Sequence, residues 1–85
     1  MREETPLSYD ADCVLHFATR YAIGRMTTAP SIVCKELLRN WSRLSRNTQV
    51  MIQREIAQAI DRGDAGAECD VAEWRKVLSR PVRAE

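Results

Sequence analysis

Three cysteines and one histidine are the residues of this 85-residue chain that could bind a metal. Cys13 and His16 lie three positions apart, so they share one face of a helix. Cys34 and Cys69 complete, by count, a three-cysteine, one-histidine ligand set of the kind that zinc uses. Structural zinc sites usually pair close ligands on a turn, and only one close pair exists here. Free cysteine is also among the most buried residue types. We therefore expect no metal and no other cofactor.

Nucleophilic catalysis is the second chemistry that these residue types allow. A cysteine, a histidine and acidic residues are present, but Cys13 and His16 fall on one short helical segment without a strained turn or oxyanion donors. The sequence has no glycine-rich phosphate loop and no paired-carboxylate motif. A chain of this length also suits a binding module better than an enzyme, because an enzyme needs a walled pocket of at least ~300 Å³. We expect a protein that is not an enzyme.

Charged residues are the third candidate, because a net charge of only +1 hides their segregation along the chain. Successive segments carry formal charges of −3 over 1–19, +6 over 20–54, −5 over 55–74 and +3 over 75–85. Four basic residues share a sector of about 80° on the predicted second helix: Lys35, Arg39, Arg43 and Arg46. They form a basic ridge if that helix continues to Ser45. If it stops near Trp41, the last two leave the ridge for a turn.

Two interpretations of this ridge stay open: an ordinary solvated face, or a contact for phosphate groups or for an acidic protein surface. An acidic zone follows it in the chain, made of Glu55, Asp61, Asp64, Glu68, Asp70 and Glu73. That zone could pair with the ridge of a second copy, or contact a basic surface that normally holds nucleic acid. We expect partner contacts at the ridge or at Asp61, Asp64 and Glu68.

Helices must position these residues, and the first is predicted to begin near Asp10 or Asp12, both good N-cap residues. Gly24 is predicted to end it in a left-handed C-terminal cap. Four residues at i, i+3, i+4 and i+7 predict its core face: Val14, Phe17, Ala18 and Tyr21.

Three further helices are predicted. The second follows a connector at 26–31 with Pro30 in its first turn, and Ser45 begins the turn and the N-cap before the third, which runs over about 47–62 and stops at Gly63. A capping box at 70–73 starts the fourth helix, and Pro81 ends it. The apolar stripe of the second helix is Cys34, Leu37, Leu38, Trp41 and Leu44. That of the third helix is Ile52, Ile56, Ala59 and Ile60, and that of the fourth is Val71, Trp74, Val77 and Leu78. Both tryptophans are expected in the core, with a dimer interface as the alternative.

The fold predicted from these elements is all-α, a compact small bundle of about four helices. A single helical domain over 9–80 follows a flexible lead-in, 1–8, and precedes a tail, 81–85. A hydrophobic content of 45% argues against disorder. No apolar stretch approaches the ~20 residues that span a bilayer, and the N-terminus lacks an apolar signal core. We therefore expect a protein of the cytosol, with reduced thiols and no membrane contact.

The segments YAIGRMT at 21–27 and APSIVC at 29–34 resemble a family of short, uncharacterised proteins encoded by phages, prophages and integrative elements of bacteria. Its members share a core motif, YALGRMTYAPSIVC. Thr28 stands here where that family usually has Tyr, and Glu55 where it has Asp. Looser similarity extends over most of the chain, at Leu44-Ser45 with Thr48, at Glu55-Ile56, and at Asp70 with Trp74.

The resemblance implies a small helical protein of mobile-element origin, and proteins of this type include anti-CRISPR inhibitors. The leading hypothesis is therefore an inhibitor that binds a bacterial defence complex, a CRISPR-Cas effector, stoichiometrically. The rival hypothesis is a small nucleic-acid-binding regulator whose second and third helices form a helix-turn-helix-like pair. Against it, Gln49, Gln53, Arg54 and Gln58 give the third helix only modest basic character. A structural or assembly factor is a third class, and homodimer formation is open.

Overall fold

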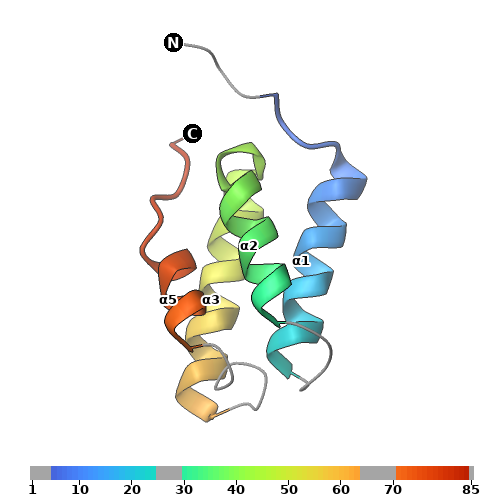
Figure 1. Ribbon diagram of the computed structural model, residues 1–85. Coiled ribbons are helices and arrows are strands. Elements are labelled where there is room, and N and C mark those ends of the chain that lie inside the picture. The colour runs from blue at the N-terminus through green and yellow to red at the C-terminus, as the bar shows by residue number, and fades with distance from the viewer. Residues whose placement is uncertain (1–4, 25–29, 64–70, 85) are drawn as a thin grey trace.

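A computed structural model describes residues 5–24, 30–63 and 71–84, and the structural statements below concern these residues. They form α1 (Tyr9–Gly24), α2 (Pro30–Asn40), the 3-10 turn η1 (Trp41–Arg43), α3 (Arg46–Arg62) and α5 (Val71–Leu78), without a strand. The predicted all-α bundle is confirmed for this part of the chain. α1 and α5 lie on opposite sides of the bundle (Figure 1), and each packs against both α2 and α3.

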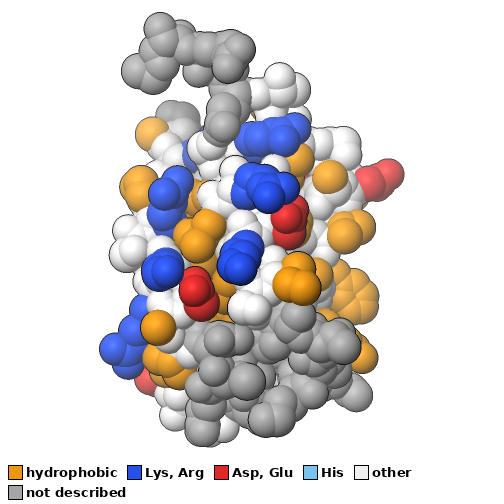
Figure 2. All heavy atoms as spheres, in the orientation of Figure 1, with side chains coloured by type: hydrophobic (Ala, Val, Ile, Leu, Met, Phe, Trp, Pro, Cys, Tyr) orange, Lys and Arg blue, Asp and Glu red, His pale blue; other side chains and the backbone are white. Residues whose placement is uncertain are grey.

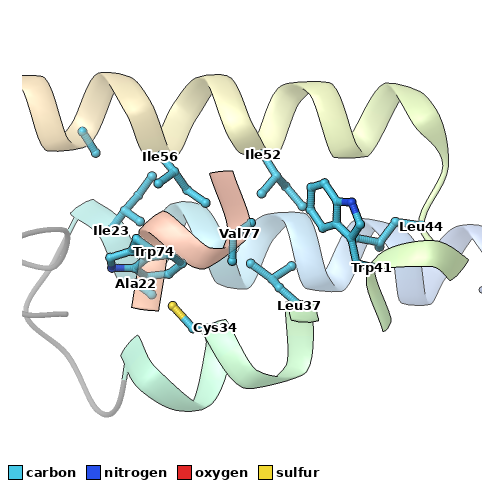
Figure 3. Close-up of a cluster of buried hydrophobic side chains, with 11 residues drawn as sticks. Ala22, Ile23, Cys34, Leu37, Trp41, Leu44, Ile52, Ile56, Trp74 and Val77 are labelled. Carbon is cyan, nitrogen blue, oxygen red and sulfur yellow. The ribbon is translucent and has the colours of Figure 1, made fainter. Parts of the chain in front are cut away.

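The core lies between these helices and is lined by the stripes predicted for α2, α3 and α5 (Figure 3). Both tryptophans are fully buried in it, as predicted, and Trp41 Nε1 donates a hydrogen bond to the carbonyl of Pro81 at 2.8 Å. Leu38, Ile60 and Leu78 pack at its margin. The buried core side chains are Ala22, Ile23, Cys34, Leu37, Trp41, Leu44, Ile52, Ile56, Ala59, Trp74 and Val77.

The first helix differs most from its prediction, because its predicted core face is exposed. Val14, Phe17 and Tyr21 are 65%, 68% and 51% exposed. The opposite face is buried instead, with Asp12, Thr19, Ala22 and Ile23. The physical reason is that α1 carries apolar residues on two sides, and the period of 3.6 residues does not say which side packs.

Both predicted caps of α1 are wrong. The N-cap is Ser8, whose Oγ accepts a hydrogen bond from the backbone amide of Ala11 at 3.1 Å. Gly24 is the last helical residue, and its φ lies outside the left-handed region. Gly63 does adopt the left-handed cap that the sequence predicts for α3, with φ 73°.

Asp12 joins α1 to the start of α3. Ser45 is the predicted N-cap of α3, and its Oγ accepts from the amide of Thr48 at 3.2 Å. The Asp12 carboxylate accepts from the Ser45 amide at 3.0 Å, from Ser45 Oγ at 3.1 Å and from Thr48 Oγ1. A carboxylate predicted to cap its own helix therefore completes the N-terminus of another.

The segments flanking the helical domain are tied to it by hydrogen bonds. The amide of Leu7 donates to the carbonyl of Arg43 at 3.0 Å. In the tail, the amide of Arg83 donates to Gln49 Oε1 at 2.7 Å, and Gln53 Nε2 donates to the carbonyl of Arg80 at 2.8 Å. The connector 26–29 and the capping residue Asp70 lie outside the described residues.

Candidate binding surfaces

The predicted basic ridge is divided, because α2 ends at Asn40. Of the two predicted lengths of this helix, the one that stops near Trp41 is therefore correct. Lys35 and Arg39 stay on α2 and are exposed. Arg43 lies on η1, where its guanidinium donates to the carbonyl of Thr5 at 2.7 Å and to Asn40 Oδ1 at 3.2 Å. Arg46 begins α3 and leaves the ridge. Half of the predicted ridge therefore remains a continuous helical surface.

Basic residues of α5 and the tail enlarge this surface, because α5 packs beside α2. Figure 2 shows Lys and Arg side chains gathered over α2, α5 and the C-terminal segment, with acidic side chains among them. On α2, Glu36 pairs with Arg39 at 3.5 Å, and on α5, Glu73 pairs with Lys76 at 3.3 Å. We name this surface the basic face: Lys35, Arg39, Arg43, Arg75, Lys76, Arg80 and Arg83.

Sequence reasoning missed the α5 and tail members of the basic face. The available signal was the charge of +3 over 75–85, but its place beside α2 depends on the packing of α5. Segments separated by about forty residues in the chain thus form one surface.

The predicted acidic zone is not one surface in the described residues. Glu55 is turned toward α1, where its Oε1 lies 3.0 Å from His16 Nε2 and 3.8 Å from Arg20 Nε. Asp61 is exposed near the end of α3, and Glu73 lies on α5 among the cations of the basic face. Asp64 and Glu68, together with Asp70, lie outside the described residues. The described acids of this zone are thus divided among three environments.

The cysteines and the histidine do not form one site either. Cys34 is fully buried in the core, whereas Cys13 is exposed on α1 and His16 contacts Glu55. Within the described residues, no group of three or more His, Cys, Asp or Glu side chains could hold a metal ion. Cys69 lies outside them.

The polar side chains that a reading helix would need are partly used inside the protein. Gln49 is fully buried and donates to the carbonyl of Trp41 at 2.6 Å. Gln53 Nε2 donates to the carbonyls of Val77 and Arg80. Of the four polar residues predicted for a reading surface on the third helix, only Arg54 and Gln58 are exposed. Two of the four polar side chains that would read the major groove of DNA are therefore occupied within the fold.

An apolar surface lies on the solvent side of α1, along the edge of the molecule in Figure 2. We name it the apolar stripe: Tyr9, Cys13, Val14, Phe17 and Tyr21. A side-chain hydrogen bond between Tyr9 and Cys13 is the main cause that raises the pKa of Tyr9. Sequence reasoning had assigned most of this surface to the core.

The described residues thus define a small all-α domain with a basic face and an apolar stripe on different helices. None of their helices has the length and apolar character needed to cross a membrane. No protein-family model, no curated protein and no solved structure matches the chain. The resemblance at 21–34 therefore stays a prediction.

Proposed function

We propose that this protein is a non-enzymatic inhibitor, encoded by a phage or mobile element, that binds an acidic protein surface of a bacterial defence complex. The basic face is the single observation that supports a binding role. It gathers seven basic side chains with only two acids among them on one side of a domain whose whole net charge is +1. Such segregation steers association with an acidic partner and selects against basic ones.

The composition of the basic face favours a protein partner over nucleic acid. Five of its seven cations are arginines, whose planar guanidinium groups bind carboxylates with two hydrogen bonds. Glu36 and Glu73 lie among them, and either carboxylate would repel a continuous phosphate backbone. A protein surface can instead place a basic side chain opposite each acid. The helix-turn-helix alternative is weakened independently by the buried Gln49.

The biological setting of the proposal comes from the resemblance rather than from the geometry. A family of phage and prophage origin suggests counter-defence, and the CRISPR-Cas effector is the target that we propose. In this role the protein would act stoichiometrically and need no cofactor, which suits a domain of 85 residues.

The test expresses the gene in bacteria that carry an active CRISPR-Cas system, and counts plaques of a targeted phage. We expect immunity to fall with the native protein and to be retained with the Lys35→Glu, Arg75→Glu double variant. Reversing two exposed charges should weaken binding about tenfold or more. Arg54→Glu is the matched control, since Arg54 is an exposed arginine of α3 outside the basic face.

Two results would count against the proposal in different ways. Undiminished immunity across effector types would refute the inhibitor role. Full inhibition by the double variant would show that the basic face is not the contact. A gel shift separates the nucleic-acid alternative, because binding to DNA or RNA weakens steeply as salt rises.

A further inference from the structure

The solvent side of α1 is apolar although the opposite side of the same helix already packs on the core. At about 100° per residue, Tyr9, Cys13, Phe17 and Tyr21 lie within a sector of roughly 120°. That sector is centred about 130° away from the buried Asp12 and Thr19, and the charged Asp10 and Arg20 are its polar residues. A surface helix of a monomer usually carries polar residues there.

The exposed area of this stripe is large for so small a domain. Tyr9, Phe17 and Tyr21 are 82%, 68% and 51% exposed. With roughly 150–250 Å² for each aromatic side chain, these three offer about 300–500 Å². Contiguous apolar patches of this size commonly mark interaction sites. Val14 and Cys13 add to the patch.

We propose that the apolar stripe pairs with the apolar stripe of a second copy, with the two α1 helices antiparallel. This inference uses α1 alone and does not depend on the basic face or on the proposed inhibitor role. Its partner is identified by charge complementarity along the stripe.

The charges that accompany the stripe have opposite signs toward its two ends, since Asp10 lies in the first turn of α1 and Arg20 in the turn before the last. An antiparallel pair centred on Leu15 places Asp10 opposite Arg20 of the second copy, twice by symmetry. The same register places Tyr9 opposite Tyr21, and Cys13 opposite Phe17. Each of these contacts occurs twice in a two-fold interface, because residue i of one copy meets residue j of the other and residue j meets residue i.

A parallel pair would be unfavourable for the same reason. Asp10 would face Asp10 of the second copy, and the two positive helix N-termini would lie side by side. The antiparallel arrangement instead sets opposite helix dipoles and opposite side-chain charges against each other. Arg20 can take part, because its side chain is 67% exposed and its ion pair with Glu55, at 3.8 Å, is long.

The area predicts a weak, reversible dimer. A standard stable interface buries about 800 Å² per partner, and the aromatic part of the stripe supplies about half of that. We therefore expect concentration-dependent association rather than an obligate dimer.

Sedimentation equilibrium of the full chain, in reducing buffer from about 5 to about 500 µM, tests the proposal over the range expected for an interface of this size. We expect the dissociation constant of Phe17→Asp to rise at least about 30-fold, as for a central aromatic contact. Ala57→Asp is the matched control, because it adds the same carboxylate to an exposed position of α3. Circular dichroism verifies that both variants stay helical.

Charge reversal then tests the register. Asp10→Arg and Arg20→Asp should each weaken the dimer about 5-fold, since each disturbs two exposed charge pairs. The double variant should restore the native dissociation constant to within about twofold. A dimer that Phe17→Asp leaves intact would overturn the proposal, as would a double variant no stronger than the single ones. A chain that stays monomeric over the whole concentration range would also overturn the proposal, and the apolar stripe would then have to bind a different protein.

Discussion

Replacing Asp12 by alanine removes the contact between α1 and the start of α3. Asp12 is buried, and its carboxylate accepts from the Ser45 amide, from Ser45 Oγ and from Thr48 Oγ1. The alanine variant leaves the Ser45 amide without its acceptor and both hydroxyls without their charged partner. It also removes a negative charge from the positive N-terminus of α3.

The magnitude follows from this geometry. One hydrogen bond to a charged acceptor contributes about 1.5–3 kcal/mol, and three bonds to one carboxylate are not additive. We expect Asp12→Ala to lower the free energy of unfolding by about 3 kcal/mol. Asp12→Asn keeps Oδ1 as an acceptor for the Ser45 amide but replaces Oδ2, the acceptor of both hydroxyls, by an amide donor, so it should cost about 2 kcal/mol. A domain of this length has only about 4–13 kcal/mol of stability in total.

Urea unfolding followed by circular dichroism at pH 7 measures the effect. With a slope of about 1 kcal/mol per molar urea, Asp12→Ala should move the midpoint down by about 3 M. Asp10→Ala is the control, because Asp10 is an exposed acid in the first turn of the same helix and should cost at most about 1 kcal/mol. If the two alanine variants unfold at the same urea concentration, the carboxylate does not join the two helices and this reasoning is refuted.

Two further predictions concern the helix ends and the tail. Gly63→Ala should destabilise the protein by about 1 kcal/mol, because the φ of Gly63, 73°, is left-handed. Gly24→Ala should stabilise the protein by about 0.5–1 kcal/mol, because Gly24 is helical and a Cβ there meets no atom within 4 Å. Thermal unfolding measures both changes, and shifts of the same sign and size would contradict the backbone conformations of the two glycines. Gln49→Leu should cost about 2 kcal/mol, because it leaves the Arg83 amide without its acceptor and removes one of the two donors to the Trp41 carbonyl, which keeps the Leu44 amide. Hydrogen exchange at Arg83 should then accelerate, and unchanged protection would contradict this account of the tail.

The parts of the fold that the sequence predicts are those set by local chemistry. Ser45 caps α3 because its side chain accepts from an amide three residues on, and Gly63 ends α3 because glycine alone enters the left-handed region without cost. The stripes of α2, α3 and α5 were predictable because each helix has one apolar side, and Ile52 and Trp74 are buried on theirs. These signals need no knowledge of neighbouring elements.

The binding surfaces were less predictable, because they depend on which elements meet. The spacing of Lys35 and Arg39 predicts a shared face, but Arg75 joins them only through the packing of α5 on α2. Helix periodicity predicts a ridge that includes Arg43 and Arg46, but α2 ends before them. A 3-10 turn at Trp41 carries no strong local signal, since tertiary burial of the tryptophan determines it.

The contact of Asp12 with Ser45 and Thr48 explains which face of α1 packs on the core. Turning α1 by about half a revolution would bury Phe17 and would take Asp12 away from Ser45 and Thr48. The start of α3 would then lose its charged acceptor, and buried donors without partners are costly. The polar contact thus fixes the face of α1 that packs, and the aromatic side chains are left outside. An exposed stripe that the fold itself maintains in this way is what an interface with a second copy requires.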